Sequence, residues 1–206
     1  GELDRIYDDL VKVRHEIAKK LGFKNFIPLA YGQMNRTDWT QEDAKAYRKQ
    51  ILESVVPLTQ KLYEEQRQRI GLEELRFYDL GLMFLSGNPM PVGDEEVLIK
   101  AAKKMYSELS PETEEFFNMM VERDLMDLTT KEGKAPGGYM TTIADYKVPF
   151  IFSNFNGTSG DVDVLTHEAG HAFQGYLARD IYPAEYRSST MEIAETHSMS
   201  MEFFTH

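Results

Sequence analysis

Two imidazoles and one carboxylate lie close together in the sequence HEAGH at residues 167–171. On an α-helix, positions four apart lie about 40° from each other around the axis, so His167 and His171 can reach one tetrahedral zinc ion. Glu168 lies roughly 100° around the helix axis from His167, where it can hydrogen-bond a water on an open coordination position of the metal. An HExxH sequence on a helix therefore predicts a zinc site in which Glu168 acts as the general base.

The surrounding sequence favours a helix for this pentapeptide, which alone is a weak signal. Upstream, the turn-rich run 154–161 ends in residues suited to capping a helix. Apolar side chains then recur with helical periodicity: Val164, Leu165, Ala169, Ala172, Phe173, Tyr176 and Leu177. We therefore expect the histidines on a helix with a large apolar face, as a buried active-site helix requires.

A third protein ligand is expected from a second helix, because a catalytic zinc ion usually has three. Gln174 and Leu177 occupy the positions at which the histidine-rich metzincin sequence has Gly and His, so that class is excluded. Ser189 and Glu192 have the spacing of a capping box, which gives Glu192 a structural role. Glu195, one turn further on, is then free to project toward the metal. We predict Glu195 as the ligand, with Glu192 as the alternative.

A glutamate pattern, E-x-x-S-x-x-x-E, begins about 24 residues after HExGH and is formed by Glu195, Ser198 and Glu202. Together the two patterns resemble the thimet oligopeptidase and oligoendopeptidase F family of zinc metallopeptidases. The segments 152–174 and 197–204 are most similar to the bacterial oligoendopeptidase F and Pz-peptidase branch. The resemblance is strong from about residue 133 onward and weaker over the helical first half.

This resemblance implies a metalloendopeptidase that hydrolyses peptide bonds in oligopeptides with one Zn²⁺ ion. The family's two histidine ligands, its glutamate ligand and its general base fall on His167, His171, Glu195 and Glu168. Family members are longer, and their substrate- and oxyanion-binding residues lie C-terminal to the glutamate helix. We therefore expect a partial sequence, with short peptides and the missing C-terminal part of the same protein as partners. The alternative is an inactive fragment that serves as a helical structural or binding module.

The expected reaction is attack of a zinc-activated water on the scissile carbonyl, with Glu168 moving the proton to the leaving amine. A ligating imidazole also needs a partner for its other ring nitrogen. Glu202 is the first candidate for that partner. Ser198 and Asp163 are alternatives that we expect to be ordinary helix-surface residues.

Composition excludes several other classes of protein. The 206 residues include no cysteine, so disulfides and thiolate ligands are impossible, which suits a reducing cytosol. A net charge of −11, from 34 acidic and 23 basic residues, argues against nucleic-acid binding. No run of about 20 apolar residues and no basic-then-apolar N-terminal segment is present. We expect a cytoplasmic protein with no membrane partner.

The pattern of apolar residues, Gly and Pro predicts a mainly α fold with a helical zinc-peptidase-like catalytic region. Helices are expected over residues 3–21, 40–70 with a bend or break at Pro57, 94–109, and from Pro111 onward. Loops are expected around residues 28–35 and over 72–93, and the acidic stretch 91–130 is expected to present a solvated outer face. We predict a helical part over residues 1–130 and a zinc-binding catalytic core over 131–206.

Two short strands are predicted before the histidine helix, at residues 139–143 and 148–152, as a small antiparallel sheet beside it. An edge strand next to the zinc helix can pair with the backbone of a peptide. Gly137 and Gly138 allow close backbone approach, so with Tyr139 they are candidates for substrate binding. An ordinary hairpin turn at the two glycines is the alternative.

Overall fold

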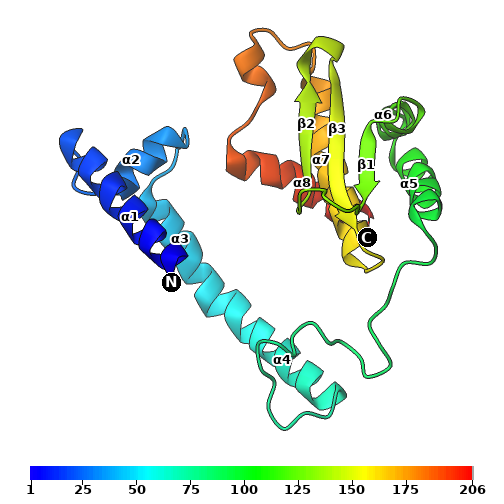
Figure 1. Ribbon diagram of the computed structural model, residues 1–206, viewed down its shortest axis with the longest axis horizontal. Coiled ribbons are helices and arrows are strands. Elements are labelled where there is room, and N and C mark those ends of the chain that lie inside the picture. Colours follow the sequence, from blue (N-terminus) through cyan, green and yellow to red (C-terminus); the bar gives the residue numbers. More distant parts are fainter. Residues whose placement is uncertain (206) are drawn as a thin grey trace. The chain divides into compact units, whose positions relative to one another are not determined.

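The computed structural model describes residues 1–205 and divides into two compact units, one over residues 1–88 and the other from Pro89 onward (Figure 1). Helices dominate both units, and the second unit also contains a three-stranded sheet. The mainly α fold class expected from the sequence is therefore confirmed. The division into functional domains at residue 130 stays a prediction, while the compact units separate near residue 88.

The first unit consists of helices: α1 (Glu2–Lys20), α2 (Phe26–Gln33), α3 (Gln41–Gln50), η1 (Ile51–Val55) and α4 (Val56–Arg69). The loop predicted around residues 28–35 is wrong, because α2 covers most of it. Asn25 caps this helix by accepting a hydrogen bond from the backbone of Ile27. Pro28 is tolerated because it lies in the first turn, where backbone N–H groups have no intrahelical acceptor.

The long helix from Gln41 to Arg69 changes its winding just before Pro57. Thr40 and Asp43 form the expected capping box at its start. Residues Ile51–Val55 then form a π-helical turn, after which α4 begins. Pro57 lacks an N–H group and its ring would clash with the carbonyl four residues earlier, and a wider turn relieves that clash. The expected disruption at Pro57 therefore takes the form of a π turn.

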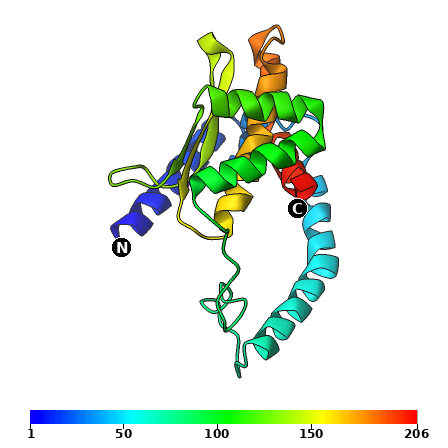
Figure 2. The same cartoon turned by 90° about the vertical axis from the view of Figure 1, so that its right-hand side faces the viewer.

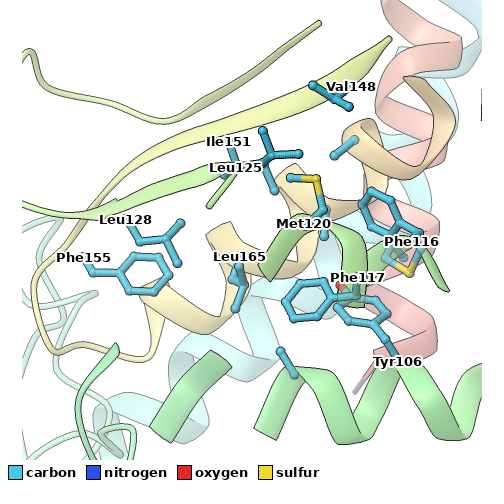
Figure 3. Close-up of a cluster of buried hydrophobic side chains, with 14 residues drawn as sticks. Tyr106, Phe116, Phe117, Met120, Leu125, Leu128, Val148, Ile151, Phe155 and Leu165 are labelled. Atoms are coloured by element: carbon cyan, nitrogen blue, oxygen red, sulfur yellow. The ribbon is translucent and has the colours of Figure 1, made fainter. Parts of the chain in front are cut away.

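The second unit begins with α5 (Glu95–Leu109) and α6 (Pro111–Glu122), which lie side by side in Figure 2. Ser110 ends one helix and caps the next by accepting a hydrogen bond from the amide of Thr113. The expectation that residues 91–130 form a solvated outer face is wrong for the inner side of these helices. Tyr106, Phe116 and Met120 have no exposed surface and lie in the main core (Figure 3).

A mixed sheet follows, formed by β1 (Met126–Thr129), β2 (Tyr139–Ile143) and β3 (Val148–Phe155) in the order β1-β3-β2. The two predicted strands, β2 and β3, pair antiparallel, with Tyr139 opposite Phe152 and Ile143 opposite Val148. β1 was not predicted, because its four residues lie within the acidic stretch, and it pairs parallel with β3. Strand β2 therefore forms one edge of the sheet.

Two helices complete the second unit: α7 (Gly160–Ala178), which packs against β2 and β3, and α8 (Met191–Thr205). The apolar side of α7 is buried through Leu165, Ala169 and Ala172, as its periodicity predicted, whereas Leu177 near its end is exposed. A short helix, η3 (Ala184–Arg187), lies in the connection between them. No helix among residues 1–205 is both long and apolar enough to span a bilayer.

Helices α7 and α8 approach each other closely at Gly170. A Cβ atom at this position would lie 2.7 Å from the Cα of Ser198 and 2.9 Å from the Cβ of Met201. Because a backbone atom cannot move aside as a flexible side chain can, this contact requires glycine. Gly170 thus fixes the distance between the two helices that carry the candidate site.

We expect Gly170→Ala to lower the free energy of unfolding by roughly 3 kcal/mol, because the added methyl group forces α7 and α8 apart. Gly175→Ala on the same helix is the matched control, since its Cβ would lie 3.4 Å from Thr142 Oγ1 and 3.6 Å from Met140 Cε. Alanine is favoured over glycine in a helix by about 1 kcal/mol, so this control should be neutral or stabilising. Urea unfolding of both variants measures the difference, and equal stabilities would contradict the close-packing argument.

Candidate metal centre

The histidine helix is anchored at its start by a buried carboxylate. Asp161 is 6% exposed and accepts hydrogen bonds from the backbone amides of Asn156 and Gly157. These bonds hold the turn between β3 and α7, which is the turn-rich run expected to precede the helix. The position of α7 relative to the sheet is therefore set within its first turn.

The side chains of His167, His171 and Glu195 converge on one point between α7 and α8. One ligand atom from each residue lies within 4.8 Å of the others. Glu195 Oε2 is 3.3 Å from His167 Nε2 and 3.7 Å from His171 Nε2. Ligands about 2.0–2.1 Å from a tetrahedral zinc ion are about 3.3–3.4 Å apart, so these separations fit a shared ion. The three residues could hold one metal ion.

The other ring nitrogen of His167 has a carboxylate partner. His167 Nδ1 lies 2.5 Å from Glu202 Oε1. A proton on Nδ1 donates to this carboxylate and leaves the lone pair of Nε2 facing Glu195 and His171. Carboxylates that bind a ligating imidazole in this way fix its tautomer and its ring orientation. Glu202, the first candidate for such a partner, thus lies at the expected nitrogen.

Ser198, which lies on α8 with Glu202, contacts the candidate ligand Glu195 on the same helix. Its side chain is completely buried, and its hydroxyl lies 3.1 Å from both the backbone oxygen and Oε2 of Glu195. The expectation that Ser198 is an ordinary surface residue is therefore wrong. Asp163, the other alternative, lies in the first turn of α7. The three polar positions of E-x-x-S-x-x-x-E all face this centre.

The capping box predicted for Ser189 and Glu192 is wrong. Helix α8 begins at Met191, and the carbonyl of Thr190 accepts its first backbone hydrogen bond from Ala194. Thr190 therefore occupies the cap position, and Ser189 and Glu192 lack the register of a capping box. The metal-binding group identified among the described residues nevertheless contains Glu195, not Glu192.

Glu168 lies beside this group but in a drier environment. It is 7% exposed, and its Oε2 atom is buried without a hydrogen-bond partner in the described structure. Burial raises the pKa of Glu168, the charge of His167 opposes this effect, and the charge of Glu195 adds to it. Burial also lowers the pKa of His171, which favours the neutral imidazole that binds metals. A carboxylate with a raised pKa is suited to accept and return a proton.

The candidate substrate residues lie where β2 begins. A Cβ on Gly138 would be 3.3 Å from Val164 of α7 and 3.4 Å from the Phe152 carbonyl, so the chain passes close to the helix here. Tyr139 stacks on Phe152 with ring centroids 5.0 Å apart. The alternative of a hairpin turn at Gly137 and Gly138 is wrong, because the turn between β2 and β3 is formed by η2 (Ala144–Tyr146).

Two residues important for this centre were missed or misjudged from the sequence alone. Gly170 was treated as part of the HExGH pattern without a function, although it allows α8 to approach α7. Ser198 was placed on the surface. For Ser198 a usable signal existed, because it lies three residues from Glu195 and four from Glu202 on one helix face.

Comparisons with known proteins find similar sequences. Residues 98–206 match the sequence model of Peptidase family M3. Oligopeptidase PepF of Bacillus subtilis is 26% identical over 150 residues, and Group B oligopeptidase PepB of Streptococcus agalactiae is 25% identical over 147 residues. Each alignment covers 71% of this chain, but only 22% of PepF and 24% of PepB.

Solved structures give a stronger match over the whole chain. Pz peptidase A with an inhibitor is 59% identical with a TM-score of 0.94, and the match covers 99% of this chain and 36% of that one. A Bacillus anthracis protein provisionally assigned as oligoendopeptidase F is 59% identical with a TM-score of 0.93, covering 99% and 38%. The chain thus spans little more than a third of the solved structures that it matches. The family resemblance expected from the sequence is confirmed.

We expect Glu195→Ala to lower zinc affinity by more than about 100-fold, beyond the usual effect of losing a residue that only orients a ligand. Glu192→Ala on the same helix should change it by less than roughly tenfold, because Glu192 lies outside the converging group. Competition titration against a chromophoric zinc chelator measures both variants. A larger loss for Glu192→Ala would identify it as the ligand.

Substitution of Glu202 should have a graded effect on zinc affinity. Glu202→Ala removes the acceptor for His167 Nδ1 and should weaken zinc binding roughly 10- to 100-fold. Glu202→Gln keeps an acceptor oxygen but loses the charge, so it should fall between the alanine variant and the unmodified protein. The same titration tests this order, and equal affinities in all three proteins would show that the 2.5 Å contact does not support the ligand.

Proposed function

This chain belongs to Peptidase family M3, and from that premise we propose that it forms the zinc-binding catalytic part of a metalloendopeptidase acting on oligopeptides. In this proposal residues 131–206 are the catalytic core and residues 1–130 the helical part of the same peptidase. The observation that carries the proposal is the convergence of His167, His171 and Glu195 within 4.8 Å of one another.

The residues present fit a zinc ion. Two neutral imidazoles and one carboxylate are a common ligand set for a catalytic zinc site, which keeps one further position open. Unlike a structural site, the group has three protein ligands and a buried carboxylate, Glu168, beside it. A zinc ion held there would lower the pKa of a bound water from about 15.7 toward 7 and polarise the peptide carbonyl.

Glu168 carries the proton transfers in the proposed mechanism. Its carboxylate accepts a proton from the attacking water and then delivers it to the amine of the departing peptide. The burial that raises the pKa of Glu168 makes its carboxylate a stronger base for the first of these transfers. Glu202 holds His167 in the tautomer that presents Nε2, and Ser198 donates a hydrogen bond to the carboxylate of Glu195.

The edge strand β2 supplies a surface on which a peptide can be held. β2 pairs with β3 on one side only, so backbone groups on its other side are available for hydrogen bonds to an extended peptide. The close approach of Gly138 to Val164 keeps the start of this strand on α7, near Glu168. Gly137, Gly138 and Tyr139 are the proposed contacts at that end.

We expect Glu168→Gln to retain zinc and to lower kcat by roughly 10²–10⁴-fold, because the amide cannot accept the proton. Glu185→Gln is the matched control, since Glu185 is an exposed glutamate in η3. Zinc content and the hydrolysis of a quenched fluorescent peptide, with and without chelator, are measured for both proteins. Full turnover by Glu168→Gln would refute the assignment of the base, and zinc-loaded protein with no turnover in any variant would favour the inactive-module alternative.

A further inference from the structure

A cavity of 380 Å³ opens beside His171, next to the candidate metal centre. Met140 and Thr142 of β2 line it on one side, and Gly175 of α7 lines it on another. The segment after α7 closes it through Arg179, Ala184, Arg187, Ser188 and Ser189. The cavity therefore adjoins both the edge strand and one of the three candidate ligands.

The charged side chains that line this cavity are all basic: Lys147, Arg179 and Arg187. One neighbouring carboxylate, Asp180, offsets part of this charge, with its Oδ1 2.6 Å from Lys147 Nζ and its Oδ2 3.8 Å from Arg179 Nε. Glu195 Oε2 lies 3.7 Å from His171 Nε2 on the metal-centre side of the cavity, so two acids lie near the three lining bases. The lining itself thus keeps a positive excess in a chain whose net charge is −11. Such a local reversal of sign favours an anionic group.

The two arginines are held in place by the segment that carries them. Gln174 of α7 donates from Nε2 to the carbonyl of Arg187 at 3.0 Å, and Arg187 Nε donates to the carbonyl of Ile181 at 2.8 Å. The guanidinium of Arg179 lies 3.7 Å from the ring centroid of Tyr176. Both arginines are half-buried. A fixed guanidinium loses less entropy on binding a carboxylate than a mobile lysine does.

The direction of β2 indicates which part of a peptide would reach this cavity. Gly138, before β2, contacts Val164 near the start of α7, whereas Thr142, near its end, lies by Gly175. β2 and α7 therefore run in the same sense. A peptide added antiparallel, the more stable pairing, runs the opposite way. Its residues on the N-terminal side of the scissile bond then lie toward Thr142 and the cavity.

We propose that this cavity is a subsite for a carboxylate of the bound peptide, supplied by an acidic side chain on the N-terminal side of the scissile bond. The inference rests on the proposed peptidase function and adds a substrate preference to it. Arg187 and Arg179 provide the planar donors that carboxylates accept in pairs, and Lys147 adds a point charge. The C-terminal carboxylate of a peptide bound in the reverse direction has the same chemistry.

The test compares peptides that differ in one functional group, a carboxylate or an amide. In the zinc-loaded protein, kcat/KM is measured for peptides with Glu or Gln two or three residues before the scissile bond, each with a free or an amidated C-terminus. We expect the Glu peptide to be preferred roughly two- to fivefold, within the range for partly exposed ion pairs. The ratio of kcat/KM for the Glu peptide to that for the Gln peptide should fall toward one in Arg187→Gln. It should also fall toward one in Lys147→Gln, although the Lys147 side chain is more exposed.

Lys104→Gln is the matched control, because Lys104 lies on the exposed side of α5 beside Glu108, away from the cavity, and it removes the same charge. Its Glu/Gln ratio should equal that of the unmodified protein. A loss of rate on amidation that Arg187→Gln abolishes would assign the subsite to the C-terminal carboxylate instead. Equal rates for all four peptides, or an unchanged ratio in both cavity variants, would overturn the subsite while leaving the peptidase proposal intact. Failure to cleave any of the peptides would count against the peptidase proposal itself.

Discussion

The contact between Gly170 of α7 and Ser198 of α8 is the constraint on which the candidate site depends. A Cβ atom on Gly170 would have no room, so the backbones of the two helices are in direct contact where they cross. This crossing brings Glu195 and Glu202 of one helix to the two imidazole nitrogens of His167 on the other. A wider crossing would separate the glutamates from the histidines by more than a zinc coordination sphere allows.

Acidic side chains gather around the imidazoles at this crossing. Glu195, Glu202 and Glu168 bring three carboxylates near two imidazoles, and burial favours the neutral form of His171. Carboxylates that lie close together repel one another unless a positive charge lies between them. A divalent ion would supply that charge, and its binding would then be coupled to the stability of this region.

The sheet and the segment after α7 define a direction in which an extended peptide could lie across the candidate centre. β2 is an edge strand that lies along α7, and the cavity at its far end has basic side chains in an otherwise acidic chain. The strand edge, the candidate metal ligands and the basic cavity all lie on one unit, from Pro89 onward. An extended peptide could therefore meet hydrogen-bonding groups, the reacting centre and a charge-selective subsite in succession.

Local sequence signals were sufficient for most helices and strands and for a proposal about the type of chemistry. The periodicity around His167, the capping signals at Thr40 and Ser110, and the alternation in β3 are properties of neighbouring residues, which explains why the corresponding helices and strands were predicted. β1 was missed because four residues without a clear pattern carry too little information, and α2 because Pro28 resembles a helix breaker when its place in the first turn is unknown.

Only the tertiary structure could decide how the residues combine. The choice between Glu192 and Glu195 rested on a capping box that does not form, and the buried position of Ser198 depends on the missing side chain of Gly170 on another helix. The cavity at His171 is lined by residues far apart in the chain, from Met140 to Ala194. Sequence spacing specifies which residues share a helix face, but distances between helices follow from packing, which no local pattern encodes.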